Sequence, residues 1–290
     1  SDDMLHLSIG CLVAATAAAA NALFITALIR RTPRVLNSYS VILLNMAGVD
    51  FMAALLSGSL GLRVQTIEAT LYFGYSGPCT LIGAQFCHRA LGKRALYVVL
   101  FAHANYLLLF SFSYRYWMLG KSSLTNAGPP QIRGRMWIIA LVSMTPTLVT
   151  MVASDSAAVF DHCPRGTICS AVHLAEPGGV MTSATKMTMI ALIWSYGVFI
   201  VGSLAVRRAL IRRIQSIRSP ERARHQMVCN SLTVLAFLPA SGICAAAAWA
   251  LDFFAIVQSP WLQRSIILMT TTFALFSPMI NLYFLKPYRR

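Results

Sequence analysis

The stretch ALYVVLFAHANYLLLFSFSYRYWML, residues 95–119, carries no charge until Arg115, close to its end. Roughly 20 apolar residues cross the hydrocarbon core of a bilayer as a helix, so this stretch is long enough to span a membrane. His103 and Asn105 lie near its middle, where a polar group without a partner costs several kcal/mol. We therefore expect this span to lie in the centre of a helix bundle, with the other spans packed around it.

The composition excludes a water-soluble globular protein. Of the 290 residues, 57% are hydrophobic and only 11% are charged, whereas soluble domains carry about a quarter charged residues. The formal net charge of +15 would suit a nucleic-acid-binding protein. However, the basic residues fall between long apolar runs, as they do in the loops of membrane proteins. The sequence predicts a protein surrounded by membrane lipid, without a nucleic-acid partner.

Apolar runs of spanning length follow one another along the chain. There are seven: residues 7–29, 39–61, 95–119, 136–153, 184–206, 228–249 and 265–285. None alternates as a barrel strand does, and a backbone in lipid must satisfy its own hydrogen bonds, so each run predicts a helix. The fold class we expect is an all-α membrane protein, a single seven-transmembrane helix bundle over residues 1–290.

The basic residues favour one side of this bundle. Most of the 24 lysines and arginines lie in the first, third and fifth links and in the tail, although Arg89, Lys93 and Arg94 fall on the other side. Asp252 and Arg264 also fall in links on that other, more acidic side. Because cytoplasmic loops carry the excess of basic residues, we expect the N-terminus outside and the C-terminus in the cytoplasm.

Four cysteines lie in the predicted outer links: Cys79, Cys87, Cys163 and Cys169. The outside of a cell is an oxidising compartment, where disulfides form and persist. We expect at least one disulfide between the top of the third span and the link after the fourth. Four cysteines allow three pairings, and the alternatives are free cysteines or a local bond between Cys163 and Cys169.

Polar residues inside the first three spans form a second group, namely Asn21, Asn45, Asp50, His103 and Asn105. An aspartate within a span usually faces the interior of a bundle. One interpretation is a polar network between spans one, two, three and seven that rearranges on switching, with a sodium ion or water. The alternative is a purely structural hydrogen-bond network. Both need the same burial, so the sequence leaves the choice open.

Arg115 lies between Tyr114 and Tyr116, where the third apolar run ends. It could be a latch that pairs inside the bundle in one state and meets a cytosolic partner in another. The alternative is an arginine that reaches for the membrane edge. Tyr114 stands where an acid would neutralise Arg115, so a latch would depend on packing and hydrogen bonds. The basic segment 207–224 after the fifth span could meet anionic lipid or a protein partner.

The motifs of hydrolases, nucleotide-binding loops and zinc proteases are absent from the sequence. The six histidines show no paired spacing, so we expect no enzyme, no metal site and no cofactor. A transporter or channel that uses the intramembrane polar residues as a path remains the alternative to a receptor.

Four stretches together resemble a known group of receptors. They are NSYSVILLNMAGVDF at residues 37–51, Gly77-Pro78-Cys79 with the later Cys87, SFSYRYWML at residues 111–119, and SPMINLYFLKPYRR at residues 277–290. The chain resembles seven-helix G-protein-coupled receptors and, within them, the nematode serpentine chemoreceptors of the Srd family. Tyr114-Arg115-Tyr116 stands where rhodopsin-like receptors carry Asp/Glu-Arg-Tyr, and the stretch from Ser277 to Asn281 stands where they carry Asn-Pro-x-x-Tyr.

The resemblance implies a chemosensory receptor in the plasma membrane of sensory neurons, with a heterotrimeric G protein as its partner. Its ligand would be a small extracellular molecule, an odorant or a secreted metabolite, bound in the outer half of the bundle. Aromatic and isolated polar side chains suit such a pocket, and the candidates are His103, Asn105, Trp194, Tyr196 and Trp249. The expected coupling and switch residues are Tyr114, Arg115, Tyr116, Arg207, Arg208, Arg212, Arg213, Pro278 and Asn281.

Overall fold

The computed structural model describes residues 2–32, 37–67, 70–82, 94–124, 169–173, 183–215, 226, 229–230, 232–238, 240–254, 256–257 and 259–284. The predicted fourth span, residues 136–153, lies outside this part of the chain, as do Cys87 and Cys163.

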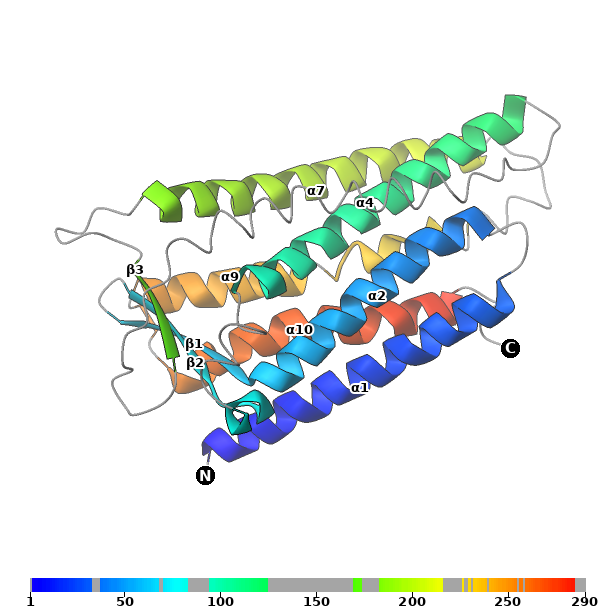
Figure 1. Cartoon of the computed structure of the whole chain (residues 1–290). Coiled ribbons are helices and arrows are strands. Elements are labelled where there is room, and N and C mark those ends of the chain that lie inside the picture. The colour runs from blue at the N-terminus through cyan, green and yellow to red at the C-terminus, as the bar shows by residue number, and fades with distance from the viewer. Residues whose placement is uncertain are drawn as a thin grey trace.

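Long helices lie side by side and form an elongated bundle (Figure 1). They are α1 (Asp2–Arg31), α2 (Asn37–Leu60), α4 (Arg94–Leu124), α7 (Ser183–Gln215), α9 (Ala240–Phe253) and α10 (Pro260–Phe284). Each overlaps one predicted span, so the prediction of membrane helices is confirmed for this part of the chain. By length and composition, three described segments could cross a membrane: Leu5–Arg31, Tyr39–Leu60 and Pro260–Phe284.

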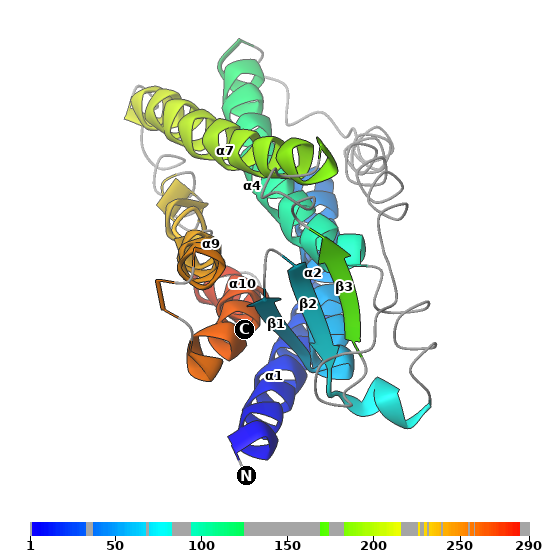
Figure 2. The same ribbon diagram turned by 90° about the vertical axis from the view of Figure 1, so that its left-hand side faces the viewer.

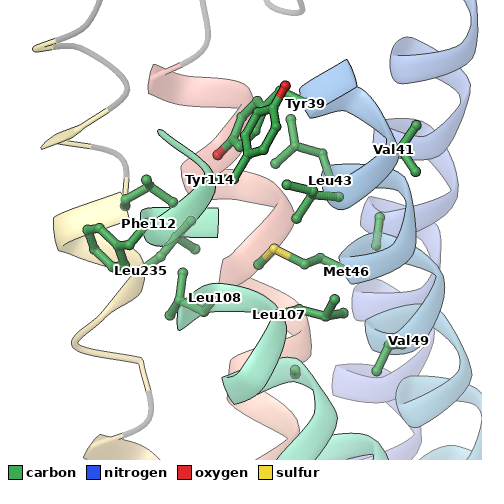
Figure 3. Packing of buried hydrophobic residues seen from close by; sticks show 14 of the residues in the cluster. Tyr39, Val41, Leu43, Met46, Val49, Leu107, Leu108, Phe112, Tyr114 and Leu235 are labelled. Carbon is green, nitrogen blue, oxygen red and sulfur yellow. The ribbon is translucent and has the colours of Figure 1, made fainter. Parts of the chain in front are cut away.

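The helices pack in a defined order. α1 contacts α2 and α10, α10 also contacts α2 and α9, α2 contacts α4, and α4 contacts α7. The largest buried cluster joins α1, α2, α4, α7, α10 and the segment 229–238 (Figure 3). Leu108 and Phe112 of α4 are completely buried in it. Since lipid is as apolar as these side chains, the cluster stabilises the bundle mainly through close packing.

A small antiparallel sheet lies at the end of the bundle where the N-terminus also lies (Figures 1 and 2). Its order is β1 (Leu62–Ile67), β2 (Thr70–Tyr75) and β3 (Cys169–His173), so β2 is the central strand. The first two strands are rich in β-branched and aromatic residues, which favour strands. The all-α prediction is therefore correct for the spans but lacked this sheet.

The hairpin of β1 and β2 returns to the end of α2. Gly61 follows the helix with a φ of 51°, a conformation that favours glycine. The Gly77 amide then donates to the Leu60 carbonyl at 2.9 Å. A Cβ atom on Gly77 would lie only 2.3 Å from the Ser59 carbonyl oxygen, so this close approach requires glycine. Together these contacts fix the sheet on α2, and the 3-10 helix η2 (Pro78–Leu81) packs on the same helix.

The two ends of the bundle are the sheet end and the Arg115 end. The sheet end contains β1, β2 and β3 and the first residues of α1, α4, α7 and α10. The Arg115 end contains the first residues of α2 and the last residues of α1, α4 and α7.

The predicted sixth span is not one continuous helix. Residues 229–230 and 232–235 are helical, residues 236–238 form a turn, and α9 begins at Ala240. Within the turn, the amides of Phe237 and Leu238 donate to carbonyls three residues back, each at 3.1 Å. Pro239 follows this turn in the sequence. Proline has no N–H and cannot donate the next backbone hydrogen bond of a helix, which accounts for the tighter turn before it.

The helices at the sheet end are longer than the sequence predicted. α9 continues to Phe253 and α10 begins at Pro260, whereas the predicted spans ended at 249 and began at 265. Asp252 and Arg264 therefore lie within helices, 1% and 5% exposed. Their assignment to solvent-facing links was wrong, because neighbouring side chains bury both charged groups.

Candidate functional site

Arg115 packs against an aromatic ring at the Arg115 end. Its guanidinium carbon lies 3.7 Å from the centroid of the Tyr39 ring, which belongs to the first turn of α2. The Tyr39 and Tyr114 rings are nearly parallel, at an angle of 10° with their centroids 6.2 Å apart (Figure 3). A hydrogen bond of 2.9 Å joins the Tyr39 hydroxyl to Ser111 Oγ. Within the described part of the chain, Nε and Nη2 of Arg115 are buried without a hydrogen-bond partner.

Further contacts join α7 to its neighbours at the same end. The guanidinium of Arg213 lies 5.2 Å from the centroid of the Tyr116 ring, which connects α7 to α4. Arg207 Nε donates to Thr233 Oγ1 at 3.0 Å, which connects α7 to the segment 229–238. The remaining predicted residues of this group, Arg208 and Arg212, are exposed. The Arg115 end thus combines exposed arginines with arginines packed on tyrosines.

A polar network joins α1, α2 and α10 deeper in the bundle. Asn21 is completely buried, and its Nδ2 donates to the Ala274 carbonyl at 2.8 Å. Pro278 lies four residues after Ala274 and has no N–H to bond that carbonyl. Asn21 therefore satisfies the carbonyl that Pro278 leaves free, and α10 continues through the proline. In this helix the proline contributes a contact with α1 and does not interrupt the helix.

Asp50 of α2 faces α10 in the same region. The Ser277 side chain is within hydrogen-bonding reach of its carboxylate, and Asn281 Nδ2 donates to the Ser277 carbonyl at 3.1 Å. Asn45 is only partly buried, and no hydrogen bond joins it to these residues in the described part of the chain. The structure thus brings together Asn21, Asp50 and Asn281 of the predicted residues, but not Asn45.

A cavity of about 10 Å³ lies beside Asp50, lined by α2, α4 and α10. This volume suits about one water molecule. A second cavity, of about 20 Å³, lies nearer the sheet end between α1, α2 and α10, and His6, Cys11 and Ser57 line it. Neither cavity is large enough for an odorant-sized molecule.

The predicted ligand contacts do not meet at either cavity. His103 and Asn105 are buried on α4, 1% and 6% exposed, and Trp249 is half-buried on α9. These three residues line neither cavity. Trp194 and Tyr196 belong to α7, but their side chains are not among those that the structure describes. The ligand pocket therefore stays a prediction.

Buried polar residues at the sheet end were missed by the sequence analysis. Gln263 Nε2 donates to Asp252 Oδ1 at 2.8 Å, which joins α10 to α9. The His6 ring donates to the Arg264 main-chain carbonyl at 3.1 Å, which joins α1 to α10. The Arg264 guanidinium also lies 5.8 Å from the centroid of the Trp261 ring, three residues earlier on the same helix. These contacts connect three helices beneath the sheet.

The structure describes two of the four cysteines of the predicted outer links, Cys79 and Cys169. Cys79 is disulfide-bonded, and its partner lies outside the described side chains. The ladder between β2 and β3 places Cys169 opposite Gly74, five residues before Cys79. The link after the second span and the link after the fourth are therefore joined by strand pairing. Which cysteine bonds Cys79 stays a prediction.

The arrangement of the helices defines the class of protein. The crystal structure of squid rhodopsin matches this chain with a TM-score of 0.63 and 12% sequence identity, over 98% of this chain and 84% of that chain. At this identity the likeness shows the fold alone, which is the seven-helix bundle of the rhodopsin class.

The sequence places the chain more narrowly. Residues 8–290 match the family described as Serpentine type 7TM GPCR chemoreceptor Srd, and the chain belongs to this family. Serpentine receptor class delta-18 of Caenorhabditis elegans is 27% identical over 276 residues, covering 90% of this chain and 79% of that protein. Serpentine receptor class delta-2 of the same organism is 24% identical over 308 residues, covering 99% and 82%. The family is one of chemoreceptors and not of enzymes.

Proposed function

We propose that the chain is a chemosensory receptor that binds a small extracellular ligand and signals to a heterotrimeric G protein. Membership of the chemoreceptor family and the fold of the rhodopsin class support this proposal. The single observation that carries the signalling part is Arg115, held at one end of the bundle with buried, unbonded nitrogen atoms in the described part of the chain. These nitrogens could donate hydrogen bonds to a protein that enters there.

The Arg115 end faces the cytoplasm in this proposal. Exposed arginines gather there, including Arg30 and Arg31 in the last turn of α1 and Arg208 and Arg212 on α7, and cytoplasmic surfaces carry such an excess. The opposite, sheet end carries the disulfide of Cys79, which suits an oxidising exterior. The two features independently support an N-terminus outside a plasma membrane.

The ligand binds in the half of the bundle nearer the sheet end, among the third, fifth, sixth and seventh spans. Asn105 Oδ1 on α4 is buried without a partner within the described part of the chain and suits a ligand with a hydrogen-bond donor. The ligand stabilises the coupled arrangement only by the difference between its affinities for the two arrangements. The ligand in this proposal is an odorant or a secreted metabolite, as the family resemblance implies.

Nucleotide exchange on purified G protein tests the proposal. The receptor is placed in nanodiscs, and volatile and secreted metabolites are screened for exchange above the ligand-free level. We expect Arg115→Ala to lower the rate of ligand-driven nucleotide exchange by at least about tenfold, because the substitution removes the proposed contact with the G protein. Arg31→Ala removes an exposed arginine from the same end and is the matched control.

The outcomes separate the candidate functions. Unchanged ligand-driven exchange in Arg115→Ala, at equal amounts of folded receptor, contradicts coupling through Arg115. Absence of exchange with every G protein, together with ligand-dependent ion flux in proteoliposomes, would instead identify a transporter or channel. The small cavity beside Asp50 does not favour that alternative, because it holds about one water molecule.

A further inference from the structure

Within the described part of the chain, the ring of Tyr39 packs on the guanidinium of Arg115. Tyr39 is 3% exposed and lies on α2, while its hydrogen bond to Ser111 and its ring contacts with Tyr114 and Arg115 all reach α4. Residues three and four apart share one face of a helix, so these contacts form one continuous surface on the last turns of α4. A single side chain of α2 is thereby fitted onto the face that contains Arg115.

The chemistry of this contact differs from an ion pair. A guanidinium group over a tyrosine ring is attracted by the negative face of the ring. The ring cannot accept the hydrogen bonds of Arg115 Nε and Nη2, which are buried without a partner among the described residues. Leaving charged donors unbonded is costly. The contact therefore holds Arg115 in place, yet a protein that offers carbonyl or carboxylate oxygens would bind Arg115 more favourably.

We propose that Tyr39 is a positioning residue that keeps Arg115 against the bundle in the resting receptor and releases it when the G protein couples. This inference rests on the proposed function, since release requires a cytoplasmic partner. The ring of Tyr39 provides the attraction, and its hydroxyl group, bonded to Ser111, orients the ring. Tyr39 thus sets how readily the unliganded receptor couples.

The first test measures ligand-free nucleotide exchange. We expect Tyr39→Leu, which removes the ring, to raise basal exchange by about 5- to 30-fold, the range expected for loss of a cation–π contact partly removed from water. Tyr39→Trp restores an aromatic face and should return basal exchange toward the wild-type level. The same basal exchange in Tyr39→Leu and wild type would overturn the proposal.

Val41→Ala is the matched control for general loosening. Val41 belongs to the same buried cluster and is 1% exposed, but its side chain points away from Tyr114, toward α1 (Figure 3). We expect this variant to lose stability without a rise in basal exchange. An equal rise in Val41→Ala and Tyr39→Leu would show that loosening at the start of α2 is sufficient, and would also overturn the proposal.

A second measurement needs no G protein, so it separates this inference from the proposed function. Unfolding of wild type, Tyr39→Leu, Arg115→Met and the double variant in detergent forms a double-mutant cycle. We expect the two substitutions to be non-additive, because each removes the same contact. Additive effects would refute the Tyr39–Arg115 contact. Clear non-additivity without any exchange on any G protein would leave the contact established and would reject the proposed function, and with it the release step.

Discussion

Gly58 provides a sharp test of the packing between α1 and α2. A Cβ atom on Gly58 would lie 2.9 Å from the Cβ atom of Ala14, closer than two such atoms approach in real structures. Both atoms are attached directly to helix backbones, so no change of rotamer can separate them. Ala14 is only 3% exposed, and Cys11 Sγ donates to the Gly58 carbonyl at 3.7 Å. Substitution of Gly58 by alanine must therefore push the two helices apart.

Two opposing effects decide the magnitude. Overpacking a close interface costs about 1–3 kcal/mol. Alanine is favoured over glycine within a helix by about 0.5–1 kcal/mol, which offsets part of that cost. We expect Gly58→Ala to lower the free energy of unfolding by about 1–2 kcal/mol. Unfolding of the purified receptor in detergent, followed by circular dichroism, measures this difference.

Gly48 is the matched control, because it lies on the same helix and a Cβ atom there would have no atom within 4 Å. We expect Gly48→Ala to be as stable as wild type or more stable. Ala14→Gly in the Gly58→Ala background removes the opposing Cβ atom and should recover most of the lost stability. Equal stability of Gly58→Ala and Gly48→Ala, or no recovery in the double variant, would refute the packing argument.

Two further predictions concern the network around α10 and the disulfide. Asn21→Leu should cost about 1 kcal/mol in unfolding experiments, because the Ala274 carbonyl loses its donor, and Pro278→Ala in that background should recover stability by supplying an N–H. Cys79→Ser should lower stability by about 2–4 kcal/mol. A reducing agent should destabilise wild type by a similar amount and leave Cys79→Ser unchanged, whereas equal sensitivity of the two proteins would contradict a stabilising disulfide.

The helices could be predicted because a run of about 20 apolar residues has few other structural solutions. Their ends could not be predicted from hydropathy, because a helix can continue past the apolar run. α7 continues to Gln215 through four arginines, nine residues beyond the predicted end at 206. Asp252 and Arg264 look like loop residues in the sequence, and only contacts from other helices explain their burial.

The sheet, and the contact of Tyr39 with Arg115 in the candidate site, depend on residues that are distant in the sequence. β1 and β2 are neighbours in the chain, but β3 comes about 95 residues after β2 and carries no signal that selects its partner. Arg115 was identifiable because it is the first charge in an otherwise uncharged run and stands where rhodopsin-like receptors carry the arginine of Asp/Glu-Arg-Tyr. Tyr39 was not, because an aromatic residue inside an apolar span is ordinary. Its importance follows from its position opposite Arg115 in the folded bundle.

The two ends of the bundle differ in what must be broken to separate the helices. At the sheet end, the pairing of β2 with β3 and the bond between Gln263 and Asp252 connect different segments. At the Arg115 end, the ring contacts of Arg115 and Arg213 and the hydrogen bonds Arg207–Thr233 and Tyr39–Ser111 join the helices. A cation–π contact contributes up to about 2 kcal/mol, and a hydrogen bond from a charged group about 1.5–3 kcal/mol.

These magnitudes indicate at which end of the bundle a small ligand can separate the helices. Reversing a two-state equilibrium from 1:99 to 99:1 requires a difference in binding energy of about 5.5 kcal/mol. The contacts of Arg115 and Arg207 together amount to at most about 5 kcal/mol, which is comparable to that difference. At the sheet end, the pairing of β2 with β3 would also have to break. In the proposed function, a ligand bound near the sheet end therefore separates the helices at the Arg115 end, and the turn at residues 236–238 gives the sixth span a place to bend.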